Sequence, residues 1–274
     1  MLQSKTLHIC QKGDLVYVTF PAFEKLGLRH AFSTRFGGVS QGMYGTANFS
    51  FTNGDDPEKV LENYRRLCGA IGVDYRRCVL SKQTHKLNVR VITEEDIGKG
   101  IVKERDYDDI DAIVTNLPGV PLVTQYADCV PVLLYDPVRQ AIGAAHASWR
   151  CTYGRIVPKT VQIMQQTYGT DPKDLVVGIA PSIGQCCFET GPEVYRAFCE
   201  HKELDMPKLA RKVGEKYYLD LWEINRIQLI HLGVKPENIT VGDLCTKCHP
   251  EVFHSHRATG GKRGNNAAII ALND

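Results

Sequence analysis

Short apolar runs recur along the chain, each bounded by proline, glycine or aspartate. Runs of this kind, rich in valine and isoleucine, are typical of β-strands. Several are apolar at every position, which indicates strands covered on both faces of a sheet. The pattern predicts strands at residues 14–20, 88–93, 111–116, 121–127, 130–136, 140–146, 174–180 and 267–272.

Three segments between these runs have the apolar spacing of helices. The first starts at an Asp-Pro pair, residues 56–57, and carries apolar side chains at 60, 64, 67 and 71. The second repeats this spacing over 157–168, and the third opens with a capping-box pair at 220 and 223. Strands and helices mix without strict alternation, which favours a layered α/β or α+β fold over a doubly wound one. No repeat or linker divides the chain, so we expect one domain over residues 1–274.

Composition narrows the class of protein. The 274 residues carry a formal net charge of +2 and no lysine- or arginine-rich run, so we expect no nucleic-acid partner. The N-terminal segment lacks the apolar stretch of a secretory signal, and the apolar runs are too short to span a membrane. We therefore expect a cytoplasmic protein without a membrane partner. Its ten cysteines are then expected to be thiols, most of them packed as small apolar side chains.

One cysteine and two histidines stand at the ends of predicted strands. Cys129 links the strands at 121–127 and 130–136, His146 ends the strand at 140–146, and His85 precedes the strand at 88–93. A hairpin would bring Cys129 and His146 together, since paired strands lie about 5 Å apart. Two imidazoles and a thiolate suit tetrahedral zinc with water in the fourth position, and zinc lowers the pKa of that water to about 7. From spacing alone, three ordinary structural residues are the commoner interpretation, because separations of 44 and 17 residues match no local zinc signature.

Two further motifs contain metal-binding residue types. The segment CTKCH, residues 245–249, matches the attachment motif of c-type haem, but haem attachment requires export. The segment also resembles half of a zinc site, and no second cysteine pair is spaced to complete it, so we interpret it as two packed thiols in a turn. The single His-x-His, residues 254–256, falls short of the several pairs that a conventional multicopper oxidase needs.

Three arginines are candidates for holding an anion. Arg35 lies in a Gly-Gly turn, TRFGGVS, whose backbone N–H groups could also face an anion, although a plain turn is the simpler interpretation. Arg150 closely follows His146, and Arg257 lies in the C-terminal loop.

Taken in order, these motifs resemble the YfiH/YlmD family of laccase-domain proteins. The resemblance extends from about residue 31 to residue 272. No single segment is decisive, whereas the ordered set is highly specific. The segments are STRFGGVS, ANFSF, NGDDPEKVLENYRRL, QTH, YADCVPVLLYD, HASWR, GIAPSIGQCCFETGPEV and LCTKCHPEVFHSHR.

The resemblance implies a single domain of layered α/β/β/α architecture and a zinc ion held by His85, Cys129 and His146. It implies phosphorolysis of adenosine, inosine, guanosine and S-methyl-5′-thioadenosine, together with deamination of adenosine. Older descriptions of the family give copper-dependent polyphenol oxidation, and copper would also bind such a site in vitro. Some relatives are linked to editing of peptidoglycan precursors.

The residues make this chemistry intelligible. Phosphorolysis requires a clamp that holds phosphate beside the ribose C1′, for which Arg35, Arg150 and, less directly, Arg257 are the candidates. Deamination requires a metal-activated water and a proton shuttle, and Asp128 either shuttles that proton or orients a ligand. We expect one pocket for both reactions, with purine nucleosides and phosphate as partners, in a monomer or weak homo-oligomer.

Alternatives and departures from the family pattern stay open at this point. Cys129 as nucleophile with His146 as base would make a cysteine hydrolase, and the same three ligands holding copper would make a polyphenol oxidase. A non-catalytic protein with a decayed site that binds a partner is the last alternative, and the presence of all three ligands argues against it. Ser148 and Cys151 replace glycines of the family pattern, which would narrow the pocket. Asn265 stands where the family has arginine, which would weaken the binding of an anion.

Overall fold

All eight apolar runs that predict strands form strands in the computed structural model, which describes residues 2–274. The eight predicted strands are β2 (Leu15–Thr19), β5 (Asn88–Val91), β6 (Ile110–Thr115), β7 (Leu122–Tyr126), β8 (Val130–Asp136), β9 (Ala141–Ala147), β10 (Val176–Ile179) and β15 (Asn266–Ala271). Seven more strands complete the sheets: β1 (His8–Lys12), β3 (Arg29–Ser33), β4 (Val79–Leu80), β11 (Glu189–Thr190), β12 (Ala210–Val213), β13 (Lys216–Leu219) and β14 (Ile239–Val241).

The three predicted helices are also present and begin within one residue of the predicted positions. Asp56 caps α2 (Pro57–Ile71) by accepting a hydrogen bond from the N–H of Glu58, and left-handed glycines end α2 and α4 (Ile156–Tyr168). Asp220 caps α7 (Leu221–His231). The shorter helices are α1 (Pro21–Lys25), α3 (Trp149–Tyr153), α5 (Pro192–Phe198), α6 (Met206–Leu209) and α8 (His256–Thr259). Single 3₁₀ turns lie at Gly42–Tyr44, Tyr75–Arg77, Glu94–Asp96, Pro172–Asp174 and Pro236–Asn238.

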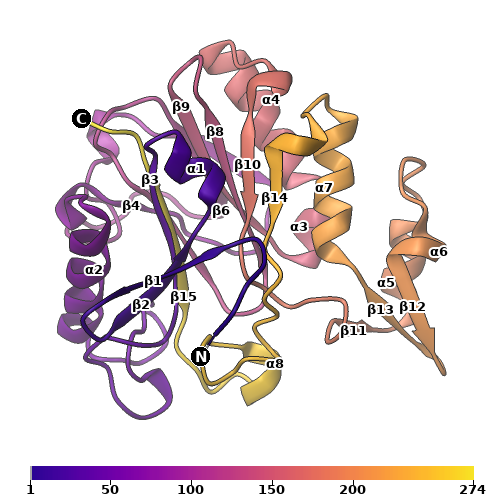
Figure 1. The fold of residues 1–274 in the computed structure, drawn as a ribbon, viewed down its shortest axis with the longest axis horizontal. Helices are drawn as coiled ribbons and strands as arrows, with labels where there is room; N and C mark the ends of the chain where they lie inside the picture. The colour runs from indigo at the N-terminus through magenta and orange to yellow at the C-terminus, as the bar shows by residue number, and fades with distance from the viewer. Residues whose placement is uncertain (1) are drawn as a thin grey trace.

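Two six-stranded sheets form the centre of the fold (Figure 1). The first has the strand order β1-β2-β3-β15-β7-β4 and the second the order β14-β10-β8-β9-β6-β5. They face each other through β7 and β15 on one side and β9 on the other, while α2 packs on β3 and α4 packs on β9, β6 and β5. The predicted α/β/β/α layering is therefore confirmed. A small third sheet, β11-β13-β12, lies with α5 and α6 at the right of Figure 1.

The central strands are buried on both faces because successive side chains enter different cores. Leu133 of β8 packs with Leu122 of β7 in the core between the sheets. Its neighbours Val132 and Leu134 instead pack with Val161 of α4 in the core beneath the helices. A third core joins α2 to the outer face of the first sheet. This arrangement explains why β8 and β9 are apolar runs with no alternation, every residue of both being buried.

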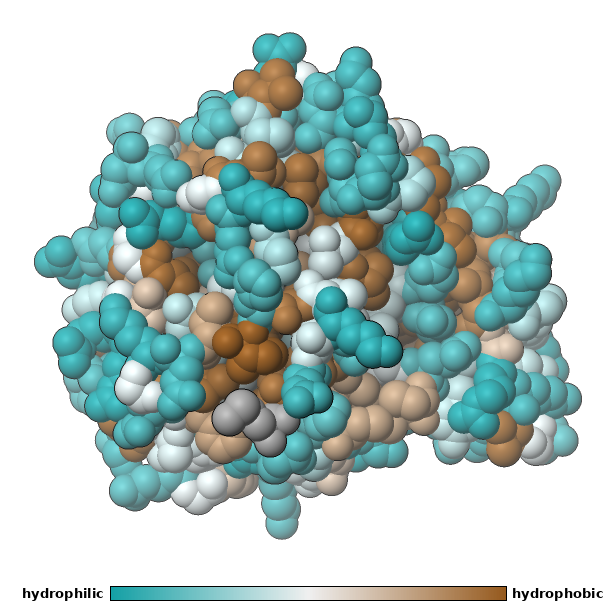
Figure 2. All heavy atoms as spheres, viewed as in Figure 1, coloured by the Kyte–Doolittle hydropathy of each residue, from teal (hydrophilic) through white to brown (hydrophobic). Residues whose placement is uncertain are grey.

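On the face shown in Figure 2, hydrophilic side chains cover most of the periphery, and apolar ones are interspersed among them toward the centre. Among residues 2–274, no helix combines the length and the apolar character that crossing a bilayer requires.

The chain crosses from one sheet to the other over only three residues. β7 belongs to the first sheet and β8 to the second, so residues 127–129 bridge the two layers at one end of the central strands. Asp128 adopts a φ of 91° in this link, a left-handed conformation that is uncommon for a residue other than glycine. The link therefore holds its side chains at the edge where both sheets end.

His30 of β3 is a buried histidine that the fold requires in its neutral form. Its Nε2 accepts a hydrogen bond of 2.7 Å from the N–H of Phe20, and its Nδ1 donates one of 2.9 Å to the carbonyl of Leu28. Burial lowers the pKa of His30 to about 4, even though the Leu28 carbonyl acts in the opposite direction. Protonation at Nε2 would leave two donors facing each other.

We expect His30→Gln to lower the free energy of unfolding at pH 7 by about 1–3 kcal/mol, because buried donors and acceptors lose partners. The neutral ring stabilises the fold fully above its ordinary pKa of 6.5, and this contribution is lost as the pH falls toward 4. In the wild type this contribution makes the free energy of unfolding fall by up to about 1.4 kcal/mol per pH unit between those two pH values. The variant should lack this pH dependence. Urea unfolding at pH 7, 5.5 and 4.5 measures this slope. The exposed His231→Gln serves as the control, and a slope unchanged in His30→Gln would contradict the assignment.

Candidate metal centre

His85, Cys129 and His146 offer ligand atoms that all lie within 4.8 Å of one another. The β8–β9 hairpin places two of them: Pro131 pairs with His146 across it, so Cys129, just before β8, lies at the same end. His85 comes from the loop before β5 with a φ of 63°, and its ring centroid lies 5.1 Å from that of His146. The structure thus brings together the three residues proposed from the sequence.

A buried carboxylate, Asp111 of β6, holds two of these ligands in place. Its Oδ1 lies 2.7 Å from Nδ1 of His146, which leaves Nε2 of that ring to bind a metal. The backbone N–H groups of Thr84, His85 and Lys86 donate hydrogen bonds of 3.1, 3.1 and 2.8 Å to the same carboxylate. The sequence alone does not single out Asp111, because an aspartate that opens an apolar run is also an ordinary strand boundary.

The charges around His146 favour a cation at this position. Burial alone would lower the pKa of His146, but Cys129 and Asp111 together raise it to about 9. Burial would raise the pKa of Asp111, yet the hydrogen bond and charge of His146 and the backbone N–H groups hold it below its ordinary value. Burial, and then the charge of His146, lower the pKa of His85. A divalent ion would take the place of the proton that this cluster attracts.

The donor set fits a zinc ion. Two imidazoles and one thiolate are ligands that zinc accepts in catalytic sites, where a fourth position stays open for water or substrate. The orientation of His146 by Asp111 is the carboxylate–histidine arrangement that such sites use. The same donors also bind copper, so the ligand types indicate a transition metal without selecting between the two.

Asp128 lies next to Cys129 and lines the cavity, with its carboxylate already engaged. One oxygen accepts a hydrogen bond of 2.7 Å from the hydroxyl of Thr246, and the other accepts one of 2.6 Å from the N–H of Arg257. Its backbone carbonyl accepts a third from the N–H of Ile183 at 2.9 Å. These contacts favour the orienting role of Asp128 over the role of proton shuttle.

A cavity of about 650 Å³ opens over the three ligands, a size in the usual range for small-molecule sites. Its lining has a strong excess of positive charge, since Asp128 is the single acidic side chain among the described lining residues. Aromatic rings line it at Phe51, Trp149 and Phe188. The basic side chains are Lys82, Arg105, Arg150, Arg257 and Arg263.

Two of the three arginines predicted to hold an anion line this cavity, namely Arg150 and Arg257. Arg35 does not line this cavity. Its guanidinium donates hydrogen bonds of 2.8 Å to the carbonyls of Gly45 and Pro250, so it fastens a turn instead of facing the cavity. The plain-turn interpretation of TRFGGVS is the one that the structure supports.

Arg263 is a cavity residue that the sequence analysis missed. Asn265 does replace the arginine of the family pattern, but Arg263 brings a guanidinium into the cavity from two residues earlier. Its Nε is buried without a hydrogen-bond partner among the described residues, and burial lowers its pKa. An unpaired buried donor of this kind is suited to an anion. In the sequence, the feature that could have indicated this role is the position of Arg263 directly before the atypical Gly264-Asn265 pair.

The two other departures from the family pattern have different places. Ser148 lines the cavity and caps α3, its hydroxyl accepting a hydrogen bond from the N–H of Cys151. Cys151 packs behind the ligands, with its Sγ 3.3 Å from the carbonyl of Lys86. The narrowing expected from added side chains therefore applies to Ser148.

The fold and the site together define the class of this protein. It is a layered α/β protein that carries a histidine–cysteine cluster where its two central sheets meet. The chain belongs to the YfiH/YlmD family of laccase-domain proteins. Residues 29–273 match the family model described as "Multi-copper polyphenol oxidoreductase laccase". The predicted family and fold class are both confirmed.

Relatives with named activities cover most of the chain. It is 37% identical over 256 residues to "Purine nucleoside phosphorylase" of Bacteroides thetaiotaomicron, covering 92% of this chain and 94% of that one. It is 35% identical over 240 residues to "Adenosine deaminase RL5" of an unknown prokaryotic organism, covering 85% and 90%. The fold matches the crystal structure of the Bacillus licheniformis hypothetical protein YfiH with a TM-score of 0.90 at 28% identity, covering 96% and 98%.

Replacing Asp111 tests the support of the ligands. We expect Asp111→Asn to weaken zinc binding about 10–100-fold, because the amide cannot accept from both His146 and the backbone N–H groups. Competition with a chromophoric chelator measures the affinity of the apo-protein for Zn²⁺. Asp96→Asn is the matched control, since Asp96 is also buried but pairs with Arg90 and Lys99. Equal zinc affinity in the two folded variants would contradict the role of Asp111.

Proposed function

We propose that the chain is a zinc-dependent purine nucleoside enzyme. It cleaves adenosine, inosine, guanosine and S-methyl-5′-thioadenosine with phosphate, and it deaminates adenosine. The observation that carries this proposal is the convergence of His85, Cys129 and His146 at a cavity rich in basic side chains. The names of the Bacteroides phosphorylase and of the deaminase RL5 support the same class of substrate.

The basic side chains suit phosphate as the second substrate. In phosphorolysis a phosphate oxygen bonds to the ribose C1′, the C1′–N9 bond breaks, and the purine leaves with a proton. Arg150, Arg257 and Arg263 can hold the phosphate dianion by charge-assisted hydrogen bonds, with one carboxylate nearby to oppose them. Holding the phosphate against the sugar converts a bimolecular encounter into a positioned attack.

The aromatic side chains suit the purine. Arg150 covers the ring of Trp149 at 4.3 Å, Arg257 lies over the ring of Phe188 at 5.8 Å, and Phe51 stacks on Tyr64. A flat base buried against such rings gains apolar contact, while its polar edge stays free to meet hydrogen-bonding groups.

His85, Cys129 and His146 would hold the zinc ion. When bound, zinc supplies Lewis acidity that makes water reactive at neutral pH, as attack on purine C6 requires. Asp111 fixes the tautomer of His146 by accepting from its Nδ1. Asp128 holds the N–H of Arg257 and the hydroxyl of Thr246, and so keeps the wall beside the ligands in position.

A second candidate, copper-dependent phenol oxidation, rests on the description of the family model and on the ability of the donor set to bind copper. One copper ion transfers one electron, whereas reduction of oxygen to water takes four. We therefore rank this activity below the nucleoside reactions. Location in the cytoplasm, organisation as one domain, and a monomeric or weakly oligomeric state stay predictions from the sequence.

Removing the thiol ligand tests the metal assignment. We expect the wild type, purified without added metal, to convert adenosine and phosphate into adenine and ribose-1-phosphate, and to form inosine when phosphate is omitted. Cys129→Ala should lose the zinc ion of the histidine–cysteine cluster, that is one ion per chain relative to the wild type, and both activities, measured by metal mass spectrometry and by chromatography of the products. Cys199→Ser, at an exposed cysteine outside the cluster, is the control. An unchanged number of zinc ions per chain together with full phosphorolysis in Cys129→Ala would overturn the assignment.

Removing a basic side chain separates the two reactions. We expect Arg263→Gln to raise the KM for phosphate about 10-fold or more, as loss of a charged hydrogen bond implies, with little change in phosphate-independent deamination. Arg139→Gln is the matched control, since its guanidinium bonds the carbonyl of Gly169 and does not line the cavity. Equal losses of both reactions in Arg263→Gln would show that the arginine supports the cavity instead of the phosphate.

A further inference from the structure

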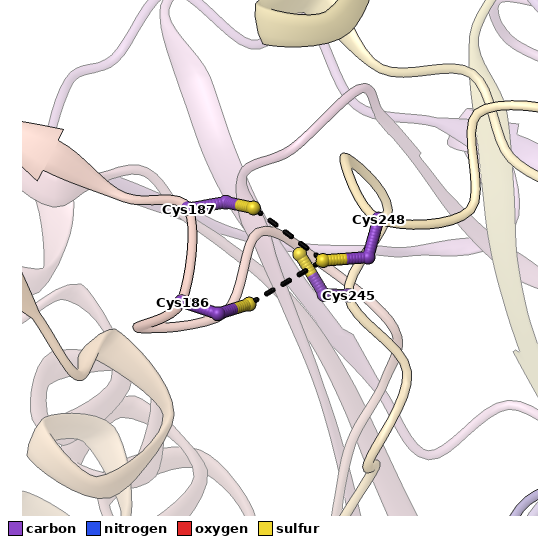
Figure 3. A group of neighbouring side chains, drawn as sticks. All are labelled: Cys186, Cys187, Cys245 and Cys248. Carbon is purple, nitrogen blue, oxygen red and sulfur yellow. Dashed lines mark hydrogen bonds between the residues drawn. The ribbon is translucent and has the colours of Figure 1, made fainter.

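The fold places the CTKCH segment, residues 245–249, next to a second pair of cysteines that is distant from it in the sequence. Cys186 and Cys187 lie in the loop after β10, and their side chains point toward Cys245 and Cys248 from the opposite loop (Figure 3). All four sulfur atoms lie within 4.8 Å of one another. The expectation that no second cysteine pair completes the motif is wrong, because the fold joins residues that are 61 positions apart.

The distances between the sulfurs distinguish this group from a disulfide. Sγ of Cys248 lies 3.6 Å from that of Cys186 and 3.4 Å from that of Cys187. A disulfide requires about 2.05 Å between sulfurs. Four thiolates around one zinc ion at about 2.3 Å place their sulfurs about 3.8 Å apart, close to the observed spacing. The buried pair Cys68 and Cys78 lies at a similar 3.6 Å, but it belongs to no group of three or more ligands among the described residues.

Hydrogen bonds from backbone N–H groups hold the two loops against each other. The N–H of Thr246 donates to the carbonyl of Ser182 at 3.0 Å, beside an isolated β-bridge between Ser182 and Cys245. The N–H of Gly184 donates to Sγ of Cys245 at 3.3 Å. Hydrogen bonds of this kind stabilise a thiolate.

We propose that Cys186, Cys187, Cys245 and Cys248 bind a second zinc ion in a closed, all-thiolate site. Binding displaces the protons of the four thiols, and four protein ligands leave no position for water or substrate. The role of this site is therefore structural. Its two loops carry Ile183 and Phe188 on one side and lead to Arg257 on the other, all of which line the cavity. The ion would therefore link two walls of the cavity. Apart from the ion, the two loops contact each other through the hydrogen bonds described above.

Metal counting tests the second site. We expect two zinc ions per chain in the wild type purified without added metal, measured by inductively coupled plasma mass spectrometry. One ion should remain in Cys186→Ser/Cys248→Ser, one in His85→Ala/His146→Ala, and none when these changes are combined. Cys199→Ser, at an exposed cysteine outside both clusters, should keep two. A count that stays the same in Cys186→Ser/Cys248→Ser would overturn the proposal.

A spectroscopic measurement removes any dependence on the folding of the cysteine variant. In His85→Ala/His146→Ala, with all four cysteines intact, X-ray absorption at the zinc edge should show four sulfur ligands at about 2.3 Å. Nitrogen or oxygen ligands in place of sulfur would overturn the site. So would an intact wild-type mass lower by two hydrogens under non-reducing conditions, which would indicate a disulfide. None of these measurements uses enzymatic activity, so their outcome is independent of the proposed function.

Discussion

The carboxylate of Asp111 is the contact on which the candidate metal centre depends. It lies on β6, between β9 and β5 in the second sheet, and is completely buried. From there it binds His146 on the neighbouring strand and three backbone N–H groups of the loop that carries His85. One rigid anion thus orients one ligand directly and fixes the backbone of another. Without the anion, two imidazoles and a thiol would lie close together with no fixed direction for their lone pairs.

The third ligand is placed by topology. Cys129 lies in the three-residue link through which the chain changes sheets, directly beside the β8–β9 hairpin. A link that short leaves little conformational freedom, and Asp128 within it adopts a left-handed backbone. Strained conformations of this kind persist where surrounding contacts hold them, and they cluster at functional sites. The cavity opens at the same edge because both sheets end there, so the ligands form part of its wall.

The sequence predicts eight of the strands and the three long helices because their signals are local. Apolar runs with turn residues at both ends, and helical spacing with capping residues, require no knowledge of distant segments. The strands missed by this approach have no such signal. β1 and β12 are mostly exposed edge strands, and β4 consists of two residues that pair with β7. These segments become strands by pairing with a neighbouring strand. The residue pattern of one segment carries no information about that neighbour.

The residues of the candidate site also fall into two groups, those that the sequence identifies and those that only the fold identifies. The three ligands stand at strand ends, where a thiol or an imidazole is conspicuous, and the family motifs select them from nine histidines and ten cysteines. Asp111 and Arg263 are ordinary in the sequence and become functional candidates only through their neighbours in space. Arg35 is the opposite case. Its Gly-Gly context in the sequence resembles an anion site, but in the structure its guanidinium donates a hydrogen bond to the carbonyl of Gly45. Side-chain direction, which spacing cannot supply, decides each case.

Asp128 connects the two proposed metal sites. Its neighbour Cys129 is a ligand of the first site, while Thr246, which donates to its carboxylate, follows Cys245 of the second. Its carbonyl accepts from Ile183, in the loop that leads to Cys186 and Cys187. Both cysteine-bearing loops therefore meet at the residue next to the first metal ligand. Because the same carboxylate also fixes the backbone of Arg257, any movement between those loops would change the position of a basic side chain relative to the histidine–cysteine cluster. Cross-linking the loops by a metal ion keeps that relation constant, which is what a site that positions an anion against a sugar requires.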